Sequence, residues 1–119
     1  MAKQYALIVG VVLLLAGVCG FFMHDLFGLI VFHPIHNVIH LGSGAIGVLV
    51  ALGKNPNGPR TFAQVFGVIY TLVAIAGFFG VVDLGSIQLG LNTTYNLIHL
   101  VVGLLGIAAG FIGAKPATA

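Results

Sequence analysis

The sequence predicts an all-α membrane protein with four transmembrane helices, built from two tandem two-helix repeats, with both termini cytoplasmic. Three observations predict this fold. The chain of 119 residues is 60% hydrophobic, it carries only four Lys or Arg and two acidic side chains, and one two-span pattern occurs twice. A soluble domain carries charge on about a quarter of its residues. This chain therefore has too few charges to surround itself with water.

Apolar residues gather in four blocks, each about as long as the roughly 20 residues that cross a bilayer. None of the blocks contains Lys, Arg or Glu. Short polar segments separate them, so sequential helices should be antiparallel neighbours in a single domain over residues 1–119. Pro34 suits the first turn of the second helix, and Asn92 the N-cap of the fourth. The predicted spans are 5–23, 35–53, 62–82 and 93–114.

The charged side chains predict the orientation of the spans. Cytoplasmic loops of membrane proteins carry an excess of Lys and Arg. Lys3, Lys54, Arg60 and Lys115 all fall on one side of the predicted spans, and Asp25 and Asp83 fall on the other. We therefore expect the termini and the middle loop to face the cytoplasm of a bacterial inner membrane, cytoplasmic or photosynthetic. Four scattered basic residues form no basic stripe, so nucleic acid is not an expected partner.

An internal repeat relates residues 5–53 to residues 62–113, with approximate ends. Both copies have a first span that ends in Gly-Phe-Phe and a second span that opens on Asn-x-Ile-His-Leu. The shared Asn and His carry the most weight, because polar residues are rare in membrane spans. Each copy has two spans, so the symmetry axis should follow the membrane normal. His40 and His99 should then lie at matching depth, about 9 Å below the outer helix ends.

Glycines recur on one face of each span, at spacings of three, four and seven residues. In lipid, small residues at such spacing let helix backbones approach closely. One interpretation is therefore a tightly packed bundle, in which Asn and His form hydrogen bonds between helices. The predicted packing positions are Gly10, Gly17, Gly44, Gly47, Gly67, Gly103, Gly106 and Gly110.

A second interpretation makes His40 and His99 cofactor ligands. An ionisable residue inside the membrane is a candidate functional residue. Two histidines related by a two-fold axis could hold a haem iron from opposite faces, and a single histidine could hold the magnesium of a chlorophyll. Asn37 and Asn96, one turn earlier, could orient the two rings. On this interpretation the cofactor would be haem b or chlorophyll, but the sequence does not determine whether one is bound. A proton relay is a further alternative, disfavoured because neither Asp lies within a span.

A third group of candidates is His24, His33 and His36, in and after the first outer loop. Imidazoles on one helix face are plausible zinc or copper ligands. The repeat limits this hypothesis, because the counterparts of His33 and His36 are Asn92 and Tyr95. A solvated histidine patch is the alternative.

The paired motifs resemble a bacterial family of small four-span membrane proteins, described as a domain of unknown function. The similarity covers nearly the whole chain. It implies the four-span fold and the importance of two Asn-x-x-His-Leu motifs, but it implies no activity. The residues that carry it are Asn37, His40, Gly44, Asn96, His99 and Gly103.

These patterns leave three functions open. The chain shows no catalytic triad, phosphate loop or metalloprotease pattern, and it contains no Glu, so we do not expect an enzyme. The first hypothesis is an accessory or structural subunit of a larger photosynthetic or respiratory complex, or a homo-oligomer. The second is a tetrapyrrole protein that uses His40 and His99. The third is a small transporter or metal-handling protein.

Overall fold

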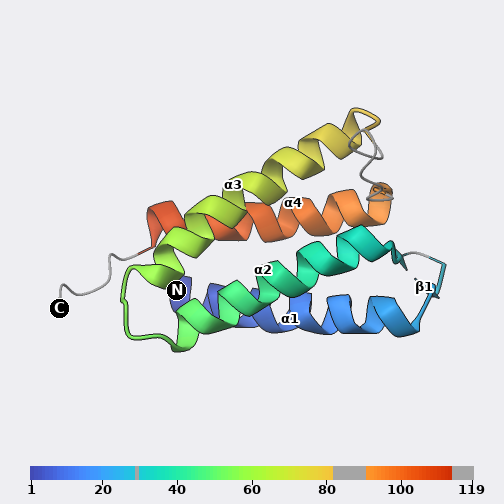
Figure 1. Ribbon diagram of the computed structural model, residues 1–119. Coiled ribbons are helices and arrows are strands. Elements are labelled where there is room, and N and C mark those ends of the chain that lie inside the picture. Colours follow the sequence, from blue (N-terminus) through green and yellow to red (C-terminus); the bar gives the residue numbers. More distant parts are fainter. Residues whose placement is uncertain (29, 82–90, 114–119) are drawn as a thin grey trace.

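Four long helices dominate the computed structural model, which describes residues 1–28, 30–81 and 91–113 (Figure 1). Each of them, the fourth with its short extension, is long and apolar enough to cross a membrane. The predicted all-α, four-span fold is confirmed. Asp83 and Lys115 lie outside the described residues. The helices are α1 (Ala2–Phe22), α2 (Pro34–Leu52), α3 (Gly58–Phe78) and α4 (Thr93–Ile107), and α4 continues into the π-helix η1 (Ala108–Ile112).

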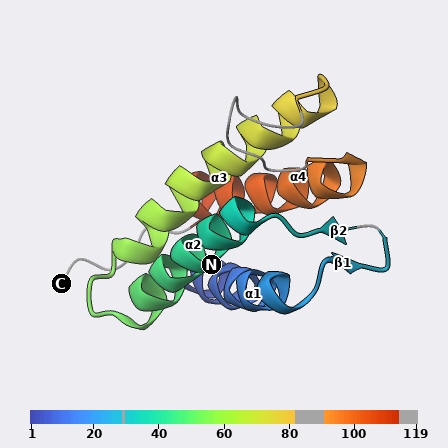
Figure 2. The same cartoon turned by 45° about the vertical axis from the view of Figure 1, so that its right-hand side comes forward.

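A small β-hairpin joins α1 to α2, in a segment where we expected only a loop. Its strands are β1 (Asp25–Leu26) and β2 (Ile30–Val31), which pair antiparallel. The turn contains Phe27 and Gly28, both with positive φ. Figure 2 shows the hairpin extending past the ends of the two helices that it connects. Two-residue strands are too short to display the alternating pattern by which strands are predicted.

The helices pair as two antiparallel hairpins, α1 with α2 and α3 with α4 (Figure 1). Backbone meets backbone at equivalent glycines of the two halves. A Cβ added to Gly10 would lie 2.8 Å from the Val48 amide nitrogen. A Cβ added to Gly67 would lie 2.6 Å from the amide nitrogen of Ile107, which is the repeat counterpart of Val48. The two repeats therefore use the same packing contact.

The other predicted packing glycines also lie against a neighbouring element. One further contact, at a glycine outside the predicted set, occurs in both halves. Gly20 packs on the Asn37 side chain, and Gly77 packs on the Asn96 side chain. At each remaining position, an added Cβ would come within 3.0 Å of an atom outside its own turn of helix. These positions are Gly17, Gly44, Gly47, Gly103, Gly106 and Gly110.

The distribution of side chains is that of a protein in lipid. Large aliphatic residues point outward, with Leu49 71% exposed and Ile8 63% exposed. Polar residues are buried in the interior. They are His36, Asn37, His40, Ser43, Asn96 and His99. Because hydrocarbon cannot hydrogen-bond to polar groups, these side chains face one another and the neighbouring helices.

Side-chain hydrogen bonds to backbone carbonyls tie the elements together. The Tyr5 hydroxyl donates to the Val102 carbonyl at 2.8 Å, which joins α1 to α4 across the two hairpins. Gln64 on α3 donates through Nε2 to the Gly110 carbonyl at 2.9 Å. Gly110 lies in η1, where the wider π-helical turn changes the pairing of backbone groups. Gln64 therefore satisfies a carbonyl at this irregular turn.

The helix ends follow the expected signals. Asn92 caps α4 by accepting a hydrogen bond from the Tyr95 amide at 2.9 Å, and Pro34 opens α2. Lys3 and Arg60 line a common hollow. This hollow lies at the end of the bundle where the α2–α3 loop is found. Asp25 lies in the hairpin at the opposite end (Figure 1). The described basic side chains thus lie at one end of the bundle and the acidic one at the other. That the basic end faces the cytoplasm stays a prediction.

We expect Gly67→Ala to destabilise the protein. The added methyl group would press on the α4 backbone, and overpacking of this kind costs about 1–3 kcal/mol. Gly42→Ala is the matched control, because a Cβ there meets no atom of the described chain within 4 Å. Thermal unfolding in mild detergent, followed by circular dichroism, should show a lower midpoint only for Gly67→Ala. Equal midpoints would contradict the close helix contact.

Candidate metal centre

Three buried histidines meet in the interior of the bundle. His36 and His40 come from α2, and His99 comes from α4. Each can offer one ring nitrogen such that the three atoms all lie within 4.8 Å of one another. The side chains are 4 to 6% exposed. The cluster therefore joins the two helical hairpins through groups that can bind a metal.

Helix geometry places these rings. His36 and His40 are four residues apart, so they lie one above the other on the same face of α2. Their ring centroids are 4.2 Å apart. His99 occupies the same position in α4 that His40 occupies in α2, in the second helical turn. Its ring centroid lies 5.7 Å from that of His36.

Two tyrosines surround the histidines. The Tyr95 ring centroid lies 4.9 Å from that of His36 and 5.7 Å from that of His99. Tyr70 on α3 lies 5.4 Å from His99. Tyr95 is the repeat counterpart of His36, so two equivalent positions contact each other near the axis that relates the repeats. The two repeats thus contribute residues from equivalent positions, but one repeat has histidine where the other has tyrosine.

Two of the imidazoles carry a buried nitrogen without a hydrogen-bond partner. Within the described part of the chain, neither Nδ1 of His40 nor Nδ1 of His99 is bonded. A buried polar atom left unpaired costs about 1–3 kcal/mol. A bound ligand could therefore satisfy these two atoms, one in His40 and one in His99.

An apolar cavity of about 500 Å³ adjoins the cluster. Its side walls come mainly from α1 and α4. His40 and His99 line it together with Tyr70 and Tyr95. The remaining lining is apolar, and it is aliphatic except for Cys19, Met23 and Phe32. This volume falls within the roughly 300–1,000 Å³ of typical ligand pockets. Two of the three clustered histidines therefore face a space large enough for an organic molecule.

Asn37 and Asn96 lie against the other helix of their own hairpin. Their side chains contact Gly20 and Gly77. The Oδ1 atom of Asn96 has no hydrogen-bond partner among the described residues. The observed contacts are those of helix packing. That these asparagines orient His40 and His99 stays a prediction.

The structure divides the three histidines of the outer loop. His36 joins the buried cluster, but His24 and His33 do not. His24 is exposed, beside the β-hairpin, and His33 is half-buried. His33 precedes the first turn of α2 in extended conformation, with φ of −106° and ψ of 141°. Its side chain therefore does not continue the helix face on which His36 and His40 lie.

A third imidazole lies beside the two histidines expected to hold a haem. The His36 ring centroid lies 4.2 Å from that of His40 and 5.7 Å from that of His99. A haem held between His40 and His99 would need room beside this buried ring. That His40 and His99 hold a haem or a chlorophyll stays a prediction.

The spacing of His33, His36 and His40 predicts that they share one face at the start of the second span, which links His36 to His40 but not to His99. The predicted metal ligands were His24, His33 and His36, and no tyrosine was among the candidates. The contact of His36 with Tyr95 also follows from their equivalence in the repeat, if both lie near the symmetry axis. Which face of each hairpin turns toward the other is a tertiary property that spacing within one helix does not determine.

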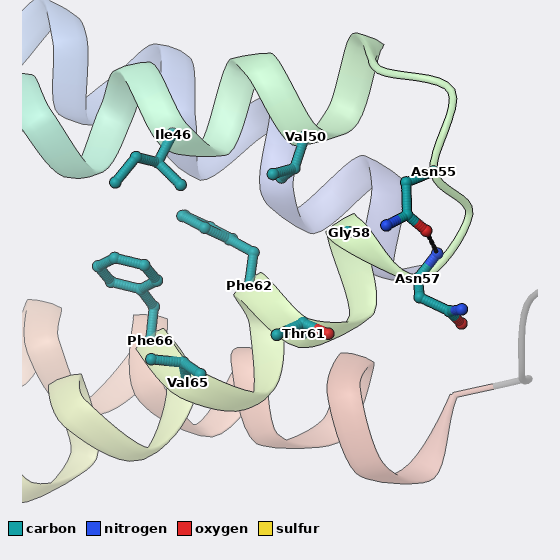
Figure 3. Close-up of a pocket in the computed structure, with 9 residues that line it drawn as sticks. All are labelled: Ile46, Val50, Asn55, Asn57, Gly58, Thr61, Phe62, Val65 and Phe66. Carbon is teal, nitrogen blue, oxygen red and sulfur yellow. Dashed lines mark hydrogen bonds between the residues drawn. The ribbon is translucent and has the colours of Figure 1, made fainter.

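A second hollow, of about 310 Å³, lies near the α2–α3 loop (Figure 3). Phe62, Phe66 and Val50 form its apolar side. The loop side is held by a turn in which the Asn57 amide donates to Asn55 Oδ1 at 2.9 Å. The residues that line this hollow include no histidine or charged group, so it offers no comparable coordination chemistry.

Comparison with known proteins identifies a family. The model of a family described as a domain of unknown function, DUF4383, matches residues 3–112. No curated protein and no solved structure matches the chain.

Chemical modification should separate the five histidines. We expect diethyl pyrocarbonate to modify His24 first and His33 more slowly. His36, His40 and His99 should react at least roughly tenfold more slowly, because buried groups react only after local opening. Mass spectrometry of peptides from the detergent-solubilised protein measures each site. Rapid modification of His40 or His99 in folded protein would contradict their burial.

Proposed function

The chain belongs to the DUF4383 family, and from the geometry of its interior we propose that it binds Zn²⁺ inside the membrane through His36, His40 and His99. One observation carries the proposal: three buried imidazoles converge within 4.8 Å, and two of them hold unpaired nitrogens. Imidazole is a preferred ligand of zinc. This is the metal-handling hypothesis, with a different ligand set.

The distances fit a metal after a small adjustment. Zinc binds histidine nitrogen at about 2.0–2.1 Å, which in tetrahedral geometry separates neighbouring nitrogens by about 3.3 Å. The three candidate nitrogens lie within 4.8 Å of one another. Small rotations of the imidazole rings can supply the remaining contraction. The helices themselves need not move far.

Three histidines leave one position of a tetrahedral ion open. Structural zinc sites usually have four protein ligands, whereas sites that exchange a ligand keep one position for water or another molecule. Two of the histidines line the apolar cavity. These features support a site that carries or exchanges a ligand or an ion. Three histidines with an open fourth position are also the ligand set of catalytic zinc sites, but the chain contains no Glu to act as a general base, so the role we propose is binding.

The tetrapyrrole hypothesis keeps one supporting observation. The cavity beside His40 and His99 could hold a pigment ligated by one histidine. The accessory-subunit hypothesis rests on small size and short loops, and it stays a prediction from the sequence. Neither hypothesis explains why a third histidine joins the other two.

Metal content tests the proposal directly. Protein extracted in mild detergent should bind one equivalent of Zn²⁺, measured by mass spectrometry of the metal and by titration of the metal-free protein. His36→Ala, His40→Ala and His99→Ala should each weaken binding by more than the roughly 10–100-fold that loss of an outer-shell partner costs. Each variant removes one of three ligands.

His33→Ala is the matched control for this experiment. It removes a histidine from the start of the same helix, but one outside the cluster, so zinc binding should be unchanged. The same loss in His33→Ala as in His40→Ala would contradict the assigned ligands. Absence of stoichiometric zinc binding in the unmodified protein would overturn the proposal.

An absorption spectrum separates the metal from the tetrapyrrole hypothesis. We expect protein extracted intact from its native membrane to show no Soret band, because the proposal assigns His40 and His99 to zinc and not to a tetrapyrrole. The spectrum should run from the near-ultraviolet to the near-infrared. A Soret band that disappears in both His40→Ala and His99→Ala would favour the tetrapyrrole function.

A further inference from the structure

A zinc ion on three neutral histidines would keep its full double charge within the membrane. Charge buried in low-dielectric surroundings is costly unless it is paired. One acidic side chain lies among the residues that the structure describes. It belongs to Asp25, which is exposed in the β-hairpin. The chain contains no Glu. No carboxylate of the described chain therefore lies at the proposed metal site. Cys19 lines the adjoining cavity, but it is outside the three-histidine cluster.

The adjoining cavity is open to the lipid-facing surface. Val12 on α1 and Leu105 on α4 both line it, and they are 55% and 58% exposed. In a membrane, such exposed aliphatic side chains contact acyl chains. The cavity therefore connects the hydrocarbon region with His40 and His99, and a molecule could enter without crossing water.

We infer that the cavity binds a fatty acid, whose carboxylate takes the fourth position on the metal and whose chain lies between α1 and α4. The inference rests on the metal binding proposed above. Carboxylate oxygen is an established zinc ligand, at about 2.0–2.2 Å. Its negative charge offsets half the charge of the ion, and its apolar chain matches the aliphatic walls.

The polar end of the cavity suits a carboxylate. A carboxylate that gives one oxygen to the metal retains an oxygen that accepts hydrogen bonds. Tyr70 lines the cavity beside His99, and its phenol can donate such a bond. An uncharged lipid would fill the same space but would leave the charge of the ion uncompensated.

Cobalt substitution provides a readout at the metal itself. Co²⁺ has a visible spectrum that reports the number and type of its ligands. Cobalt-loaded protein in non-ionic detergent should change its spectrum on addition of equimolar laurate. Methyl laurate, which has the chain without the charge, and equimolar acetate, which has the charge without the chain, should leave the spectrum unchanged.

Cavity-filling variants provide matched controls. Val12→Trp and Leu105→Trp place a large ring in the cavity from opposite walls, so they should keep cobalt binding but lose the response to laurate. Val11→Trp and Leu104→Trp alter adjacent residues of the same type that are also exposed but do not line the cavity. Both should respond as the unmodified protein does.

The outcomes separate the two proposals. No cobalt binding by the unmodified protein means that the metal site itself fails. Cobalt binding without a laurate response overturns the fatty-acid inference and leaves the metal site standing. An equal response to acetate identifies a water-borne anion as the fourth ligand, and a laurate response that persists in both cavity-filling variants places the ligand elsewhere. Each of these results overturns the inference.

Discussion

Close backbone contact at glycine is the constraint on which this structure depends. Lipid tails are as apolar as leucine, so the hydrophobic effect does not drive helices together within the membrane. Dispersion forces between surfaces that fit closely must do so instead. The contact of Gly10 with Val48 and that of Gly67 with Ile107 allow this approach in the two hairpins. The lipid-facing surface can then be assembled from almost any large aliphatic side chain.

The same approach determines where polar groups lie. Once each hairpin is closed, the Asn and His side chains within its second span lie in the interior, since lipid cannot hydrogen-bond to them. They are Asn37 and His40 in one half and Asn96 and His99 in the other. The hairpins meet with His36 of one half against Tyr95 of the other, at ring centroids 4.9 Å apart. The Tyr5 hydroxyl adds a hydrogen bond from α1 to the Val102 carbonyl. Polar and aromatic side chains thus join the two helical hairpins, and contacts at glycine hold the two helices of each hairpin together.

Much of the fold could be predicted from the sequence, because local rules determine it. Span length, the Asn92 cap and the spacing of the packing glycines follow from helix geometry and bilayer thickness. The candidate site could be predicted only in part. His40 and His99 were singled out by the repeat, but the membership of His36 depends on how the hairpins rotate about their own axes. The exclusion of His33 depends on a backbone that is extended one residue before α2 begins.

The difference between the two repeats determines what kind of site they form. A perfect repeat would place histidine at both His36 and Tyr95 and would offer four imidazoles, a set that closes a tetrahedral ion. Tyrosine at one of these positions reduces the set to three. His40 and His99 keep their equivalent positions and both line the apolar cavity. The loss of symmetry at one residue pair therefore leaves three clustered imidazoles beside a lipid-accessible cavity. For the metal site proposed above, this is the difference between a ligand-exchanging site and a structural one.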